Sequence, residues 1–323
     1  PEPARSAGLL AGLAAAESIV SLRQGDGSAT PHLPYAALPG TGVYQPTPNP
    51  EFPEQITPMF EGWASLKPFV MHSPSQFRVK PGKILNTSRL AYALEYIEVK
   101  HVGSARVRGA APDSEQSDIP RFWAGGGSNW NVTARVILDG LGLDSWQHAR
   151  LFALLNMAQS DVSVAVMDSK YVYTFWRPVT AIRWHNDGNP LTVPDPAWRP
   201  FLVTPPYPDY PCNLPANTGA AAEVLRRVLG TDRIGFTRTF NAAALPLPDD
   251  MDADPGDGIP AQLPPKAITR SFDRLSHAEA EAAMSRVYAG IHFRSGCAVG
   301  VRLGNEVGRF VSRNVLLPAR GRR

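Results

Sequence analysis

Two short segments of the chain combine cations and a histidine at spacings that suit the binding of an anion. In the segment KYVYTFWRP, Lys170 and Arg177 are seven residues apart, which at 100° per residue returns them to nearly one helix face. The proline after Arg177 disfavours helical geometry there, so we expect its guanidinium where the helix ends. In the segment SRVYAGIHFR, a helix that carries Arg286 is expected to end at Gly290 and to present His292 beyond its end.

A third segment, YPDYPCNLPANT over 207–218, is a Pro-rich loop that runs into the N-terminus of an expected helix over 218–229. The first turn of a helix has backbone N–H groups without intrahelical partners, and these can bind an anion. A tetrahedral oxyanion is held best by several converging donors, of which Arg supplies a forked pair. Taken singly, each segment has an ordinary explanation as surface charge or structural histidine. Taken together, they match the pattern of a known family.

The three segments resemble the vanadium-dependent haloperoxidases of the type 2 phosphatidic acid phosphatase superfamily. The resemblance rests on the patterns Lys-x6-Arg-Pro, a Pro-led loop that enters a helix, and Ser-Arg-x3-Gly-x-His, and it extends over 42–311. Similar stretches lie at 42–48, 73–78, 121–123, 168–183 and 285–294.

This family resemblance implies an all-α, mainly helical fold whose four-helix bundle holds the anion site. Lys170, Arg177 and Arg286 match the family's cations that hold the vanadate or phosphate oxygens. His292 matches the histidine that bonds vanadium in the peroxidases or attacks phosphorus in the phosphatases.

The chain departs from the family pattern at four positions of this site. Where the family has Pro-Ser-Gly-His, the loop has a proline followed by Cys212, Asn213 and Leu214. Leu214 cannot transfer a proton, and Asn213 is bulkier than the glycine that approaches the oxyanion. The aspartate that follows the axial histidine by four residues and orients it is Gly296. From these departures we expect no metal, no vanadate and no other cofactor.

The two cysteines, Cys212 and Cys297, both lie in segments that the family uses for its active site. Three interpretations stay open. The cysteines could form a disulfide across the former vanadate pocket, Cys212 could be a reactive thiol whose pKa the cations lower, or it could be a small buried side chain in place of serine.

Aromatic side chains surround these motifs and could line a pocket for a flat organic ligand, although ordinary core packing explains them equally well. They are Tyr171, Tyr173, Trp176, Tyr207 and Tyr210. Of these, Trp176, Tyr173 and Tyr210 are predicted, with Asn213 and Leu214, to bind the substrate.

These observations favour a vanadium-independent, non-oxidative enzyme of natural-product biosynthesis. It would rearrange, isomerise or cyclise a small polyketide or terpenoid in the former oxyanion pocket, with cations stabilising a developing enolate. His292 would act as general acid or base, and Lys170, Arg177, Arg286 and Cys212 complete the catalytic set. The alternatives are a non-catalytic binding protein and a haloperoxidase with an altered site.

Composition limits the other function classes. The chain has 323 residues, with 32 Lys and Arg against 29 Asp and Glu, so its net charge of +3 gives no electrostatic basis for nucleic-acid or membrane partners. No run reaches about 18 uninterrupted apolar residues, and the Ala-rich stretch 7–20 is expected to be a core helix. We therefore expect a cytoplasmic protein, with export and a homodimer left open.

The elements that must position these residues are mainly helices. Apolar periodicity predicts helices over 88–101, 131–140, 144–172, 218–229, 277–289 and 299–316. The 27 Gly and 32 Pro gather in the loops between them. We expect one domain over 1–323, with segment 24–81 wrapped over the helical core and a mobile acidic loop over 245–265.

Overall fold

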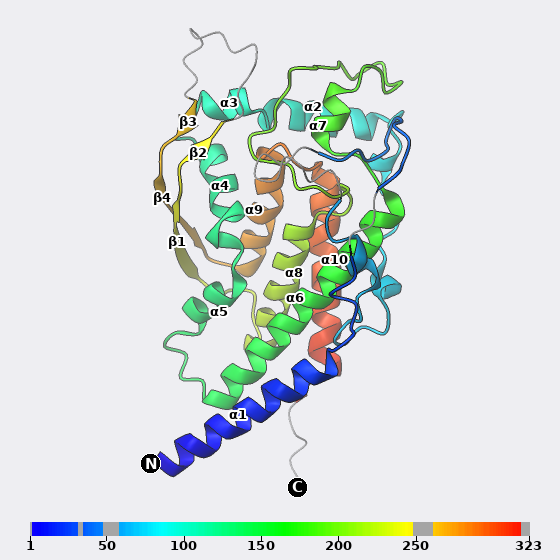
Figure 1. The fold of residues 1–323 in the computed structure, drawn as a ribbon. Helices are drawn as coiled ribbons and strands as arrows, with labels where there is room; N and C mark the ends of the chain where they lie inside the picture. Colours follow the sequence, from blue (N-terminus) through cyan, green and yellow to red (C-terminus); the bar gives the residue numbers. More distant parts are fainter. Residues whose placement is uncertain (1, 32–34, 48–57, 248–260, 318–323) are drawn as a thin grey trace.

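Four helices form the centre of the molecule and confirm the helical fold class (Figure 1). The computed structural model describes residues 2–31, 35–47, 58–247 and 261–317. The central helices are α6 (Ser145–Tyr173), α8 (Asn213–Leu229), α9 (Leu275–Tyr288) and α10 (Arg294–Asn314), which pack against one another. They bury a core made mainly of Leu, Val, Ala and aromatic side chains.

Shorter elements surround this bundle. The other α-helices are α1 (Glu2–Leu22), α2 (Leu90–Val102), α3 (Ala105–Gly109), α4 (Glu115–Ala124), α5 (Trp130–Leu138) and α7 (Pro178–Arg183). Short 3-10 turns are η1 (Glu61–Ser65), η2 (Pro74–Phe77), η3 (Lys83–Leu85) and η4 (Gly126–Ser128).

The starts of three helices differ from the sequence-based prediction. Helix α6 begins as expected, because Asp144 forms a capping box with Gln147. Helices α8 and α10 each begin five residues earlier than predicted, at Asn213 and Arg294. Ser276 would be the expected N-cap of a helix that begins at residue 277, but α9 begins at Leu275 with Arg274 as its N-cap, and the Ser276 hydroxyl donates to Asp232 at 2.7 Å.

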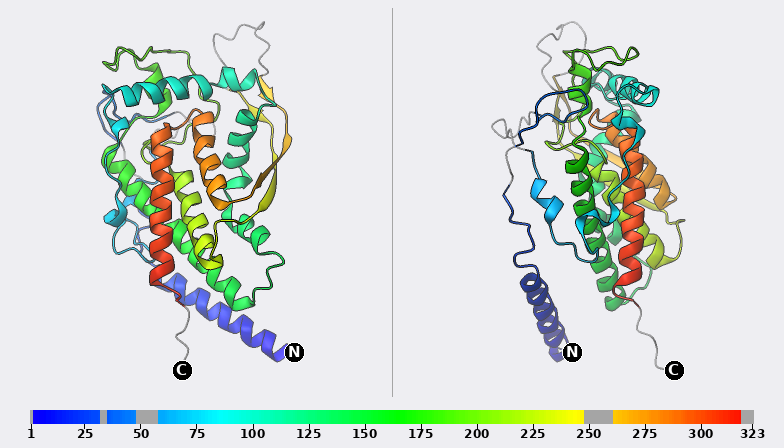
Figure 2. Two further views of the ribbon diagram at one scale, coloured as in Figure 1. Left: turned by 180° about the vertical axis from the view of Figure 1, so that it is seen from behind. Right: turned by 90° about the vertical axis from the view of Figure 1, so that its right-hand side faces the viewer.

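Helices α8 and α10 lie side by side at unusually close range, as both views in Figure 2 allow the reader to follow. A Cβ atom on Gly300 would lie 2.4 Å from the carbonyl oxygen of Cys212, and one on Gly304 would lie 2.1 Å from the carbonyl oxygen of Ala216. One on Gly308 would lie 2.7 Å from the carbonyl oxygen of Ala220. Glycine every fourth residue therefore gives α10 a backbone face on which α8 can rest, and it fixes the start of α8 beside α10.

Two strand pairs, which the sequence pattern did not indicate, cover α4 and α5. Strand β1 (Phe236–Ala242) pairs antiparallel with β4 (Lys266–Phe272), and β2 (Leu245–Pro246) pairs with β3 (Gln262–Leu263). The prediction of a loop over 245–265 is therefore wrong at both ends. Residues 248–260, which hold its acidic part, lie outside the described residues.

Segment 24–81 runs along α6, and its described parts contain only short 3-10 turns (Figure 2, right). Buried Asp161 of α6 holds it, because its carboxylate accepts hydrogen bonds from the backbone N–H groups of Phe69, Val70 and Met71 at 2.6, 2.8 and 2.9 Å. The same side chain thus supplies partners for three consecutive backbone donors of a segment whose described residues form no α-helix and no strand.

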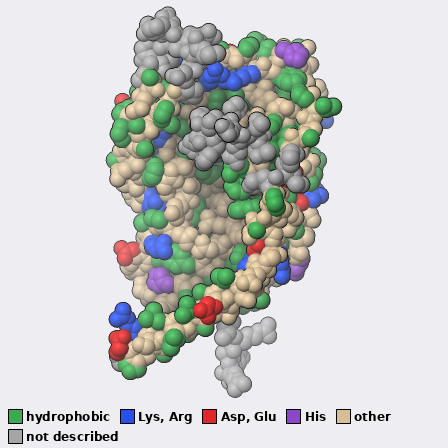
Figure 3. Space-filling view, viewed as in Figure 1, with side chains coloured by type: hydrophobic (Ala, Val, Ile, Leu, Met, Phe, Trp, Pro, Cys, Tyr) green, Lys and Arg blue, Asp and Glu red, His purple; other side chains and the backbone are tan. Residues whose placement is uncertain are grey.

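Helix α1 confirms the predicted helix over 7–20 but not its place in the core, since none of its residues is buried. Figure 3 shows apolar side chains along it open to solvent. By length and composition, α1 is the one helix among the described residues that could cross a membrane. Arg23, directly after it, holds the chain to the body by donating to the carbonyl oxygens of Lys67 at 2.5 Å and Pro68 at 3.2 Å.

Candidate active site

Lys170, in the last turn of α6, reaches the backbone of the Pro-rich loop that precedes α8. Its Nζ donates to the carbonyl oxygens of Pro208 at 2.5 Å and Asp209 at 2.8 Å, and its side chain is fully buried. The ring of Tyr207 lies 5.0 Å from the same nitrogen. The family resemblance implies that Lys170 holds an oxyanion, but here its ammonium group donates to carbonyl oxygens of the loop.

Arg177 approaches the same loop from a different helix. The prediction that it shares a helix face with Lys170 is wrong, because α6 ends at Tyr173 and Thr174 turns the chain with a φ of 44°. Arg177 is the N-cap of α7, and its buried guanidinium donates from Nε to Tyr207 O at 2.7 Å and from Nη1 to Ile291 O at 2.8 Å. Its Nη2 is buried and has no hydrogen-bond partner among the described residues.

His292 lies between α9 and α10, as predicted, after Gly290 turns the chain with a φ of 76°. Arg177 Nη1 lies 2.8 Å from its Nε2. Since a guanidinium can only donate, Nε2 is the acceptor and the proton of the neutral ring is on Nδ1. That nitrogen lies 2.7 Å from Oδ1 of Asp209.

Asp209 was not among the predicted site residues, but it lies in this cluster. Its side chain is fully buried, and it faces His292 at a distance that suits an orienting carboxylate, although neither of its oxygens has an aligned hydrogen bond among the described residues. A Cβ atom at Gly296 would lie 3.4 Å from Oδ2 of Asp209. The carboxylate that the family places four residues after the histidine is thus replaced by one that approaches from the loop. The signal was present in the sequence as a charged residue inside the YPDYP segment.

Burial moves the pKa values of this cluster toward neutrality or beyond. Loss of solvent raises the pKa of Asp209 to about 7, against the lowering effect of Arg177 and Lys170. Loss of solvent, with Arg177 nearby, lowers the pKa of Lys170 to about 7. The same desolvation and the surrounding cations hold the pKa of His292 well below its usual range, so the imidazole is neutral at physiological pH.

Arg286, on α9, is buried beside this cluster and adds to its positive charge. Its Nε donates to Ser285 Oγ at 3.1 Å, and its Nη2 donates weakly to Pro120 O at 3.5 Å. Desolvation lowers its pKa from the usual arginine value, and its charge contributes to the lowered pKa of His292. The structure therefore places all four predicted charged or titratable residues in one buried region.

Cys212 and Cys297 are free and fully buried thiols, so the structure does not contain the disulfide alternative. Cys212 is the N-cap residue of α8, and its backbone N–H donates to Gly296 O at 3.0 Å. Burial, with a hydrogen bond to Cys212, holds the pKa of Cys297 well above its usual range. A reactive thiol at Cys212 stays a prediction.

The predicted substrate-binding residues fall into two groups. Asn213 and Leu214 are the first two residues of α8. The Oδ1 of Asn213 accepts a hydrogen bond from Asn217 Nδ2 at 3.0 Å, and Leu214 packs against the main hydrophobic core. Tyr173 and Tyr210 meet edge to face at 5.7 Å, with their hydroxyls bonded to Val79 O and Lys80 O. Trp176 is fully buried and lies against the ring of Tyr92. Their role toward a substrate stays a prediction.

The arrangement offers proton chemistry more readily than oxyanion binding. Asp209 and Lys170 each have a pKa near 7, and His292 is a neutral base whose two nitrogens face an acid and a cation. Groups whose pKa values lie near neutrality are the efficient general acids and bases. Within the described residues, no group of three or more His, Cys, Asp or Glu side chains could hold a metal ion.

Comparison with known proteins places these residues in a family context. A family model described as the VCPO second helical-bundle domain matches residues 150–320. The vanadium chloroperoxidase of Curvularia inaequalis is 30% identical over 173 residues, which make up 45% of this chain and 27% of that protein. The chain thus spans about a quarter of this curated relative's length.

Two solved structures share the architecture. A crystal structure of the first bacterial vanadium-dependent iodoperoxidase superposes with a TM-score of 0.72 at 28% identity, covering 94% of this chain and 68% of that one. A holo-type bacterial vanadium-dependent chloroperoxidase has a TM-score of 0.66 at 18% identity, covering 89% of this chain and 64% of that one. The second similarity shows the fold alone.

Proposed function

Because the chain belongs to the vanadium chloroperoxidase family through its second helical-bundle domain, we propose that it uses the family's anion region for non-oxidative chemistry without vanadium. In this proposal it rearranges, isomerises or cyclises a small polyketide-type or terpenoid-type substrate in natural-product or antibiotic biosynthesis. His292 transfers the proton, Asp209 orients it, and the buried cations stabilise negative charge on a substrate oxygen.

One observation carries the proposal: Lys170 and two of the three guanidinium nitrogens of Arg177, which would hold vanadate, bond to the protein itself. Lys170 donates to two loop carbonyls, and Arg177 donates to two more and to His292 Nε2. Both nitrogens of His292 face protein groups, which leaves neither directed at a vanadium atom. Asn213 and Leu214 supply neither the close backbone approach nor the proton donor of the family's loop. This set of residues does not fit a vanadate ion.

A substrate oxygen has one evident partner in the cluster. Arg177 Nη2 is buried and has no protein acceptor among the described residues, and Arg286 lies close enough to influence the same region. A fixed cationic donor in a desolvated site stabilises an enolate or alkoxide as it develops, which is usually the largest electrostatic contribution to catalysis. As the anion forms, the substrate loses a proton, and in this proposal the neutral imidazole of His292 accepts it at Nε2 once Arg177 Nη1 turns from that nitrogen to the developing oxygen anion.

Two assays on the purified protein test the proposal. In the first, vanadate is titrated and then hydrogen peroxide and iodide, bromide or chloride are added; we expect neither saturable vanadate uptake nor halide oxidation. In the second, polyketide and terpenoid intermediates are incubated with the protein, and mass spectrometry coupled to chromatography detects products of unchanged mass. Conversion should be lost in His292→Ala and Arg286→Gln and kept in His148→Ala, whose histidine is partly exposed on α6.

Each alternative function has its own outcome in these assays. Tight vanadate uptake with halogenation would refute the proposal and establish a haloperoxidase with an altered site. Saturable binding of an intermediate without conversion would establish a non-catalytic binding protein, for which the complete burial of Lys170 and Arg177 is the supporting observation.

A further inference from the structure

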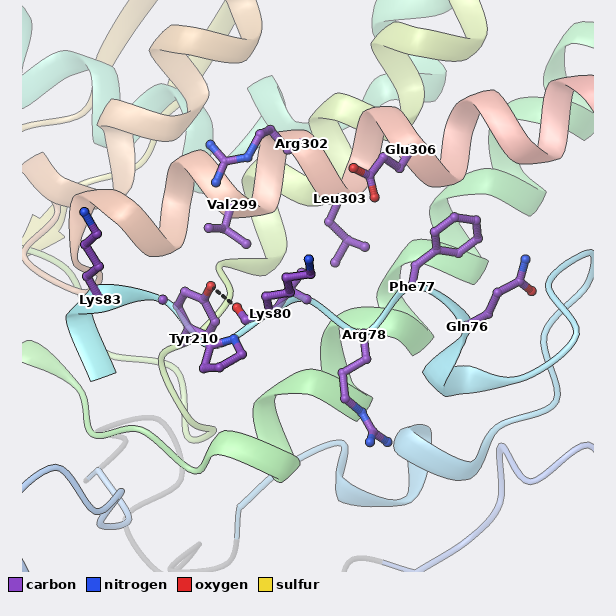
Figure 4. A pocket seen from close by; sticks show the side chains of 13 residues that line it. Gln76, Phe77, Arg78, Lys80, Lys83, Tyr210, Val299, Arg302, Leu303 and Glu306 are labelled. Atoms are coloured by element: carbon purple, nitrogen blue, oxygen red, sulfur yellow. Dashed lines mark hydrogen bonds between the residues drawn. The ribbon is translucent and has the colours of Figure 1, made fainter. Parts of the chain in front are cut away.

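A cavity separate from the buried His292 cluster opens between segment 76–83 and helix α10 (Figure 4). Its volume is about 560 Å³, which lies in the range of about 300–1,000 Å³ that small-molecule sites occupy. None of Lys170, Arg177, Arg286 and His292 lines it. Its occupant is therefore a question apart from the proposed function.

The cavity carries an excess of positive charge. Lys80, Lys83 and Arg302 line it, and within the described parts of the chain none of these three side chains has an ion pair or donates a hydrogen bond. Glu306 is the one acidic residue among the lining residues, and it lies one helical turn after Arg302. The three cations are therefore available to a ligand.

A neighbouring arginine shows the contrast. Arg78 also lines the cavity, but it binds Asp168 through Nε and Nη2 at 2.7 Å each. Figure 4 shows it directed away from α10, whereas Arg302 and Lys80 lie on the α10 side of segment 76–83. Arg78 thus has its carboxylate partner within the protein, and the three other cations do not.

The floor of the cavity is apolar and fixed. The ring of Tyr210 forms part of it, held by a hydrogen bond from its hydroxyl to Lys80 O at 2.8 Å. The ring lies against Gly82, where a Cβ atom would come within 3.0 Å of the hydroxyl oxygen. Tyr210 and buried Leu303 of α10 are each only 1% exposed, so the apolar surface open to a ligand comes from the half-buried Phe77, Val79 and Val299. A preformed apolar surface next to several cations suits a ligand with an acidic head and an apolar body.

We propose that this cavity is a binding site for a small organic anion. The carboxylate or phosphate of the ligand is held by Lys80, Lys83 and Arg302, and its apolar part packs on Phe77, Val79 and Val299. Because Tyr210 directly follows Asp209 in the chain, the site adjoins the loop that orients His292 without sharing its cations.

The first test measures the binding of 2-naphthoate by isothermal titration calorimetry, with neutral 2-naphthamide as the matched probe and 2-naphthyl phosphate as the second acid. We expect saturable binding of at least one of the two acids and none of the amide at comparable concentration. Equal binding of the amide, or no saturable binding of either acid up to about 10 mM, would overturn the proposal.

The second test locates the bound probe with charge-neutralising variants. Arg302→Gln should weaken acid binding about tenfold, and Lys83→Gln should weaken it as well. Arg313→Gln removes the same charge from an exposed position of the same helix and should leave binding unchanged. His292→Ala should also leave it unchanged. An equal loss in Arg313→Gln would indicate non-specific attraction, and a loss in His292→Ala would place the probe in the other site; either result contradicts the proposal.

Discussion

Asp209 Oδ1 lies 2.7 Å from His292 Nδ1, and the same carboxylate fills the space in front of Gly296. The carboxylate of Asp209, from the loop before α8, therefore lies where a side chain at position 296 of α10 would point. A side chain at 296 and the carboxylate at 209 compete for it, since a Cβ atom at 296 would lie 3.4 Å from Oδ2 of Asp209. This relationship leads to the first prediction.

Gly296→Asp should destabilise the protein by about 2–4 kcal/mol, because it buries a second carboxylate beside Asp209. The double variant Asp209→Ala with Gly296→Asp should recover much of this loss, since it returns to one acid. Urea unfolding of both single variants and the double variant measures the coupling. Gly296→Ala controls for volume and should be mild; strictly additive effects would contradict the shared position.

The pH dependence of stability should change when Asp209 is replaced by Asn. The folded-state pKa of Asp209 is raised to about 7 from 3.8, so the native state retains its proton longer than the unfolded state does. This contribution to stability is complete below about pH 4 and is lost as the pH rises through about 7. The Tm of wild type should therefore fall relative to that of Asp209→Asn from pH 4 to pH 8, and an unchanged difference between the two would speak against the raised pKa.

Lys170→Met should show the opposite dependence. The pKa of Lys170 is lowered from 10.5 to about 7, so its contribution is complete above about pH 10.5 and is lost as the pH falls through about 7. The Tm difference between wild type and Lys170→Met should grow from pH 7 to pH 10. Lys80→Met, at an exposed lysine, serves as the control and should show no such growth.

Gly304→Ala should lower the free energy of unfolding by about 1–3 kcal/mol, because the new methyl group would lie 2.1 Å from Ala216 O and force α8 away from α10. Gly12→Ala makes the same chemical change on exposed α1, where no atom lies within 4 Å of the new Cβ. Its effect on global unfolding should stay within about 0.5 kcal/mol. Chemical denaturation compares the two, and equal losses would refute the close helix contact.

Removal of residues 1–22 should change the Tm little, since no residue of α1 is buried. Arg23→Ala should cost about 1–2 kcal/mol, because it removes hydrogen bonds to Asp26 and Lys67 and a guanidinium placed 4.2 Å from the ring of Phe69. Differential scanning calorimetry on both variants tests the ranking. A larger loss for the deletion than for Arg23→Ala would show that α1 supports the fold.

Much of the helical framework could be predicted from sequence because helix periodicity is local. Asp144 was expected to begin the helix that forms α6 and is its N-cap, and the helix predicted over 218–229 ends at Leu229, just before Gly230. The starts of α8 and α10 were not predicted, since Pro215 and the glycines of α10 weaken the periodic pattern. The first turns of α8 and α10 depend on packing between these two helices, which cannot be read from a short stretch of sequence.

The sequence by itself determined which side chains are present: the cations, His292 and the four departures from the family's pattern. Only the tertiary structure decided how they are used. It directs Lys170 and Arg177 to loop carbonyls and brings Asp209 to His292 in place of the missing carboxylate. The physical reason is that buried donors and charges must find partners, and those partners come from segments distant in sequence.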